Sequence, residues 1–105
     1  MDPMIYRTYL EKKPGDRFAM YSLALALKKA GDINGAEMAF QELLDIHPLS
    51  GAGHYQHGLL LHEAGRDADA IAAWKRGLDA LRGVNDPEAR RSQSEIQGAL
   101  DDLDG

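Results

Sequence analysis

The sequence has no cysteine among its 105 residues. Disulfides, thiolate metal ligands and cysteine nucleophiles are therefore excluded together. Valine and threonine are nearly absent, with only Val84 and Thr8, whereas alanine and leucine are plentiful. Because β-branched residues favour strands and the abundant residues favour helices, we expect an all-α protein without a sheet.

The sequence also lacks a long apolar run and an excess of positive charge. It is 44% hydrophobic and 28% charged, which is too polar for a membrane span and suits a single domain over residues 1–105. The net charge is −5, and lysines form only the doublets Lys12-Lys13 and Lys28-Lys29. Nucleic-acid-binding proteins concentrate basic residues on one face, so we expect neither nucleic acid nor membrane as a partner. The first residues do not read as a secretory signal, and we expect a cytoplasmic location.

A pattern that returns after 34 residues organises the chain. It consists of an alanine-glycine pair, four residues, an alanine, three residues and a bulky aromatic side chain. The two copies are Ala30-Gly31, Ala36 and Phe40, followed by Ala64-Gly65, Ala70 and Trp74. A repeat of this length is typical of stacked helix pairs, in which each pair buries its apolar face against its neighbours.

Capping residues and prolines predict the helix boundaries. Asp2-Pro3 is a good helix start and Pro14-Gly15 a good stop. Tyr6 stands 34 residues before Phe40, so this first helix is expected to be the second half of a repeat whose first helix is missing. The expected elements are a half repeat at 2–14, a repeat at 17–48, a second repeat at 51–82 and a C-terminal capping helix at 87–103. We expect about five antiparallel helices.

The spacing within each copy resembles the tetratricopeptide repeat, whose pattern is W-x2-L-G-x2-Y, A-x3-F and P. Residues 17–48 show Met20-x2-Leu23-Ala24-x2-Leu27, Ala36-x3-Phe40 and Pro48, and residues 51–82 show His54-x2-His57-Gly58-x2-Leu61 and Ala70-x3-Trp74. The resemblance implies a right-handed helix-turn-helix superhelix. Two departures stand out: His54 and His57 replace bulky apolar residues, and Arg82 replaces the final proline. We therefore expect the second helix of that repeat to run past the usual stop.

Close helix contact is the physical basis of this pattern. Small residues set the distance between two helices, and an aromatic ring fills the wedge between successive pairs. The core residues predicted on this basis are Tyr6, Leu27, Ala36, Phe40, Gly58, Leu61, Ala70 and Trp74.

A second apolar stripe runs beside the core stripe on the first helix of each repeat. In the tetratricopeptide family the first helices line a concave groove that holds peptides, so the resemblance implies a partner-binding role for this stripe. Its members are Phe18, Tyr21, Leu25 and Lys28 in one repeat and Tyr55, Leu59 and His62 in the next. The partner would be another protein that offers an apolar or helical peptide segment. The alternative is that the half repeat or the last helix covers the stripe.

Four histidines suggest a metal site, but their spacing opposes it. His54 and His57 share one helix face, whereas His62 lies roughly 80° around the helix from His54, and no carboxylate completes a known ligand pattern. The sequence likewise has no nucleophile elbow, no phosphate loop and no paired carboxylates beside a candidate base. We expect no metal, no cofactor and no catalytic residue.

These observations favour a non-catalytic protein-interaction module. A rival hypothesis comes from the small number of repeats, because roughly three are usually needed to bury a continuous core. On this hypothesis the chain is a structural unit that forms a homodimer through its terminal helices. A mass measurement at two concentrations separates the two hypotheses.

Overall fold

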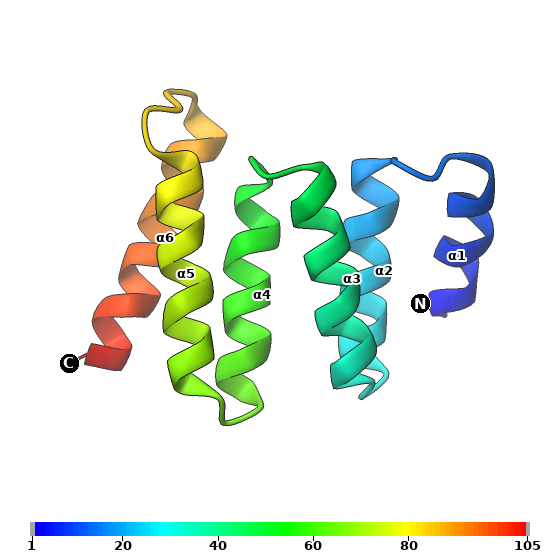
Figure 1. Ribbon diagram of the computed structural model, residues 1–105, viewed down its shortest axis with the longest axis horizontal. Coiled ribbons are helices and arrows are strands. Elements are labelled where there is room, and N and C mark those ends of the chain that lie inside the picture. Colours follow the sequence, from blue (N-terminus) through cyan, green and yellow to red (C-terminus); the bar gives the residue numbers. More distant parts are fainter. Residues whose placement is uncertain (1, 105) are drawn as a thin grey trace. The chain divides into compact units, whose positions relative to one another are not determined.

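The computed structural model describes residues 2–104, and over that range helices are the only regular secondary structure (Figure 1). The helices are α1 (Pro3–Lys12), α2 (Arg17–Lys29), α3 (Ile33–Ile46), α4 (Gly51–Glu63), α5 (Asp67–Leu81) and α6 (Pro87–Asp104). The all-α helical-repeat fold is therefore confirmed. The expected count of about five was too low, because the half repeat and the C-terminal segment supply one helix each and the two full repeats supply four.

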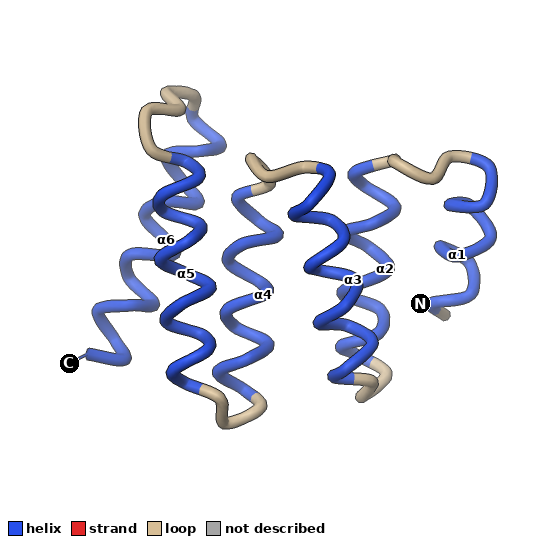
Figure 2. Tube along the Cα trace, in the orientation of Figure 1, coloured by secondary structure: helices blue, strands red, loops and turns tan. Residues whose placement is uncertain are grey.

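Contacts divide the chain into two compact units, Met1–Pro48 and Leu49–Gly105. The first unit contains α1, α2 and α3, and the second contains α4, α5 and α6. Short loops and turns join the helices within each unit (Figure 2). The boundary between the units falls directly after the proline that ends the first predicted repeat.

Side-chain caps begin five of the helices in the described part of the chain. An oxygen of each capping residue accepts a hydrogen bond from a backbone N–H in the first turn of the helix, at 2.8–3.2 Å. The caps are Asp2, Asp16, Asp32, Ser50 and Asp86. Each such cap stabilises its helix by about 1 kcal/mol. After α2 and α4 the chain turns at Gly31 and Gly65, whose φ angles of 85° and 79° are left-handed and favour glycine.

In the first unit, α2 packs against α3 and α1 packs against α2. The buried side chains of α2 and α3 include Ala19, Met20, Leu23, Ala24, Leu27, Ala36, Ala39, Phe40 and Leu43. His47 Nε2 at the end of α3 lies 2.7 Å from the carbonyl oxygen of Gly15 and donates to it, which ties α3 to the loop between α1 and α2. By contrast, α1 has no fully buried residue, and its Tyr6 is half-buried.

In the second unit, α4, α5 and α6 all pack against one another. Trp74 is the largest buried side chain, with 1% of its surface exposed. Its indole N–H donates to the carbonyl oxygen of Tyr55 at 3.0 Å, so the buried polar atom is satisfied. The indole ring lies directly on Gly58, where an added Cβ would overlap Nε1 and its ring neighbours. Only glycine therefore allows α4 and α5 to approach this closely.

The last helix is part of this core. Ile96 and Leu100 of α6 are 0% and 5% exposed and belong to the same buried cluster as Trp74 and Leu81. An added Cβ on Gly51 of α4 would overlap the Ser92 side chain, so α4 and α6 also lie in close contact. The segment expected as a capping helix thus completes the interior of the second unit.

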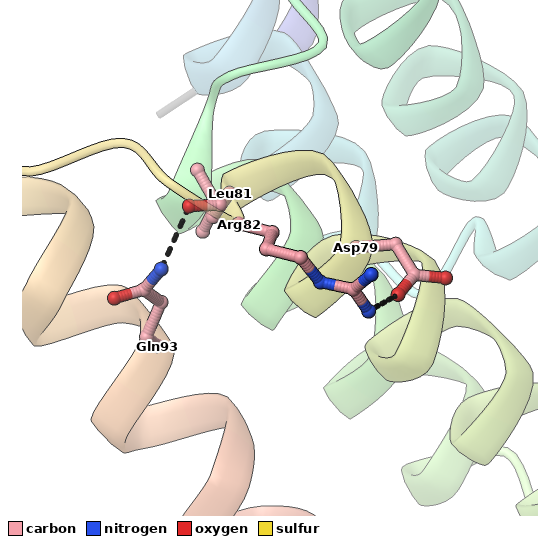
Figure 3. A network of polar contacts seen from close by, with 4 residues as sticks. All are labelled: Asp79, Leu81, Arg82 and Gln93. Carbon is pink, nitrogen blue, oxygen red and sulfur yellow. Dashed lines mark hydrogen bonds and ion pairs between the residues drawn. The ribbon is translucent and has the colours of Figure 1, made fainter.

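The end of α5 differs from that of α3, because Arg82 occupies the position of the usual proline. Its last helical residue, Leu81, lies one residue beyond the position that corresponds to Ile46 at the end of α3. The Gln93 side-chain amide of α6 donates to the Leu81 carbonyl oxygen at 2.7 Å, as Figure 3 shows. Arg82 pairs with Asp79 at 2.6 Å, but both side chains are mostly exposed, so this pair contributes little. The helix is thus one residue longer than α3, but it ends at Leu81, before the position of the usual proline, so the expectation that it runs past the usual stop was wrong.

The same substitution at two helical glycines tests the contact between α4 and α5. Gly58→Ala should lower the free energy of unfolding by about 1–3 kcal/mol, because the new methyl group overlaps the Trp74 ring. Gly98→Ala in α6 should instead raise it by up to about 1 kcal/mol, because no atom lies within 4 Å of the added Cβ and alanine favours a helix. Urea denaturation measures both values. Equal shifts in the two variants would contradict the close approach of α4 and α5.

Candidate functional site

Helix α2, the first helix of the first full repeat, carries four of the residues that sequence analysis placed on a binding stripe. Phe18 is 75% exposed, and Tyr21, Leu25 and Lys28 are half-buried. The positions follow a helical spacing of three or four residues, so they share one side of α2. We call these four residues the α2 face.

Helix α1 lies beside the α2 face. Tyr6 of α1, together with Ser22, Leu25, Ala26 and Lys29 of α2, lines a small cavity of about 170 Å³. Leu25 therefore stands at the border between α1 and the α2 face. The exposure of Phe18 shows that this aromatic ring remains open to solvent in the structure.

The corresponding residues of the second unit are Tyr55, Leu59 and His62, which we call the α4 face. All three are half-buried and line a cavity of about 430 Å³, which we call the α6 cavity. Trp74 also lines it, and α6 contributes Ser94, Glu95, Gly98, Ala99, Asp102 and Leu103. Its volume lies at the lower end of the range for ligand sites.

His62 is held in place at one end of the α6 cavity. Its Nδ1 lies 2.7 Å from Asp67 Oδ1 at the start of α5. The His62 ring is also 6.5 Å from the Trp74 ring, centroid to centroid, with the planes tilted by 45°. These two contacts position the imidazole against α5. Across residues 2–104, the structure shows no group of three His, Asp or Glu side chains that could hold a metal ion.

The two other histidines of α4 lie in the interior. His54 and His57 are 7% and 3% exposed. An added Cβ on Gly77 of α5 would come within 2.7 Å of His54 Cβ, so α5 packs directly on His54. The imidazoles thus occupy the positions where the family pattern has bulky apolar side chains.

The residues expected in the core occupy two environments. Leu27, Ala36, Phe40, Gly58, Leu61, Ala70 and Trp74 are buried, whereas Tyr6 is half-buried. Tyr6 differs because α1 is packed against α2 alone among the helices of its unit. Its ring borders a cavity, whereas Phe40 and Trp74 are enclosed.

Sequence analysis kept open that the last helix covers the stripe, but it did not identify the residues of α6 that line the site. Small and acidic residues of α6 line the cavity over the α4 face: Ser94, Glu95, Gly98, Ala99 and Asp102. Their spacing of three and four residues was visible in the sequence as one face of a helix. Nothing in that spacing distinguishes a cavity wall from ordinary solvated surface, whereas Ile96 and Leu100 lie on the buried side of α6.

A comparison with protein-family models finds a match to the tetratricopeptide repeat over residues 18–50. The matched segment contains α3, all of α2 except Arg17, and the whole α2 face. The match confirms the resemblance for the repeat at 17–48, and the repeated helices of the structure agree with it. No curated protein matches the chain. In the described part of the chain, no helix has the length and apolar character needed to cross a bilayer.

Two phenylalanines of the first unit allow the same substitution on its surface and in its core. Phe18→Ala should change the free energy of unfolding by less than about 0.5 kcal/mol, because the Phe18 ring is 75% exposed. Phe40→Ala should lower it by about 3–5 kcal/mol, because the Phe40 ring is fully buried. Urea denaturation followed by circular dichroism provides the comparison. A large loss for Phe18→Ala would mean that this ring is a packing residue and not an available surface.

Proposed function

Since the chain carries a tetratricopeptide repeat, we propose that it is a non-catalytic interaction module that binds an apolar or helical segment of another protein. The α2 face and the α4 face are the contact surfaces in this proposal. Tetratricopeptide repeats generally mediate protein–protein interaction, which supports the general function. The cytoplasmic location and the absence of nucleic acid and membrane among the partners stay predictions.

The exposed ring of Phe18 is the observation that favours the α2 face. A phenylalanine with 75% of its surface in solvent forfeits most of the free energy that burial would provide. Tyr21 and Leu25 extend the apolar surface along the same side of α2 and are only half-buried. Aromatic side chains of this kind are frequent binding hot spots, because a partner that covers them removes a large apolar area from water.

The experiment compares the parent with two charge substitutions at exposed apolar residues. Phe18→Asp introduces a carboxylate into the α2 face. Met38→Asp introduces a carboxylate on α3, outside that face, where the Met38 side chain is 62% exposed. Proteins that co-purify with each variant from the native cells are quantified by mass spectrometry, and affinity for a recovered partner is then measured with purified proteins. The partner should bind Phe18→Asp at least about tenfold more weakly than the parent. Met38→Asp should retain it.

Equal retention of the partner by all three proteins would refute binding through the α2 face. Both variants must also unfold with the free energy of the parent within about 0.5 kcal/mol, as expected for exposed positions. This control separates a lost contact from a lost fold.

Self-association is the second candidate function, and α1 carries the observation that favours it. Ile5 and Tyr9 are 54% and 45% exposed. The residues 34 positions later, Ala39 and Leu43 of α3, are 8% and 0% exposed. A second copy of the chain would cover this surface of α1 in a homodimer. Sedimentation at two protein concentrations tests it: a mass that rises with concentration supports the dimer, and a constant monomer mass rules it out.

A further inference from the structure

The α6 cavity has an apolar floor built by three helices. Tyr55 and Leu59 of α4 and Ala99 and Leu103 of α6 pack against the buried cluster around Trp74, and each is only partly buried. Their remaining apolar surface faces the cavity that they line. An apolar side chain placed there would remove this surface from water, which is favourable by about 25 cal/mol per Å².

Two carboxylates stand beside that floor. Glu95 and Asp102 of α6 both line the cavity, and both residues are exposed. Neither pairs with a cationic side chain in the described part of the chain, and no lysine or arginine is among the residues that line the cavity. The segment 86–105 holds six acidic and two basic residues, so the surroundings reinforce the negative potential.

One stretch of the cavity wall carries no side chain. Gly98 lies between Glu95 and Asp102 on the same side of α6, and no atom lies within 4 Å of the Cβ that would be added there. Glycine inside a helix costs about 1 kcal/mol relative to alanine. Its presence here keeps the space between the two carboxylates open.

We propose that the α6 cavity receives a large apolar side chain of a partner segment whose neighbouring lysine or arginine residues pair with Glu95 and Asp102. This inference rests on the proposed function and adds the chemistry of the partner: a basic, apolar peptide segment. The apolar floor supplies the affinity, and the carboxylates discriminate against acidic segments. The position of Gly98 lets the peptide backbone approach α6.

The protein contains its own reporter for this site. Trp74 is the only tryptophan, and it lines the cavity. The probes are a short synthetic peptide in which leucines are flanked by lysines and a matched peptide with glutamate in place of every lysine. Titration of the full chain with each peptide is followed by Trp74 emission and by calorimetry. The lysine peptide should bind at least about tenfold more tightly than the glutamate peptide, and its affinity should fall as salt is added.

Substitutions at one position separate occupancy of the cavity from stability of the fold. Gly98→Leu places its own side chain in the cavity. It should lower the affinity for the lysine peptide by a factor of about ten or more. Gly98→Ala is the matched control, which adds a single methyl group and should keep the affinity within about twofold. Both replacements favour the helix, so neither is expected to unfold the protein.

Substitutions of the carboxylates test the charge separately. Glu95→Gln and Asp102→Asn should each lower the affinity for the lysine peptide by about two- to fivefold, as expected for ion pairs near the surface. Neither substitution should lower the affinity for the glutamate peptide. Asp86→Asn removes a charge from the helix cap at the other end of α6. It should leave the affinity for the lysine peptide unchanged.

Three results would overturn the inference: no binding of the lysine peptide, equal binding of the two peptides, or equal binding by Gly98→Leu and the parent. These failures are distinguishable from failure of the proposed function. If a natural partner is lost with Phe18→Asp while the lysine peptide does not bind, the interaction module stands and the basic specificity of the α6 cavity is wrong.

Discussion

The contact between Gly58 and Trp74 is the constraint on which the second unit depends. Without a Cβ at Gly58, the indole ring can lie against the backbone of α4, and its N–H reaches the carbonyl oxygen of Tyr55 at 3.0 Å. This close approach sets the distance between α4 and α5, and α6 packs on both of them. The same ring also borders the α6 cavity. A packing contact of the core therefore helps to fix the floor of the candidate site, and Glu95 and Asp102 of α6, which take no part in that contact, are the residues proposed to give it specificity.

The first unit uses a smaller version of the same arrangement. Ala24 and Phe40 are both 0% exposed, so an alanine and a phenylalanine occupy the positions that Gly58 and Trp74 hold 34 residues later. Its candidate surface differs in kind. The α2 face presents an exposed aromatic ring, whereas the α4 face lines a cavity with acidic residues on α6. One repeat pattern thus gives two surfaces with different chemistry, because the flanking helices α1 and α6 differ in sequence.

Much of the fold could be predicted from the sequence because its signals are local. The aspartate and serine caps, the Ala-Gly turns and the 34-residue period each act within one helix or one helix pair. The site depends on packing between helices, which period and capping do not report. Nothing in the sequence showed that Gly98 would face a cavity or that Glu95 and Asp102 would lie beside the α4 face. The hydrogen bond from the Gln93 side chain to the Leu81 carbonyl oxygen could not be predicted for the same reason, because its donor and acceptor belong to different helices.

Unfolding of Trp74→Ala tests the central claim most directly. If the indole ring sets the spacing of α4, α5 and α6, its removal leaves a large cavity and removes the hydrogen bond to the Tyr55 carbonyl oxygen. The variant should lose about 3–5 kcal/mol of a total stability of about 5–10 kcal/mol, and its thermal transition should lose cooperativity. Circular dichroism of the parent and the variant measures this. A Trp74→Ala protein that melts cooperatively within a few degrees of the parent would contradict the account.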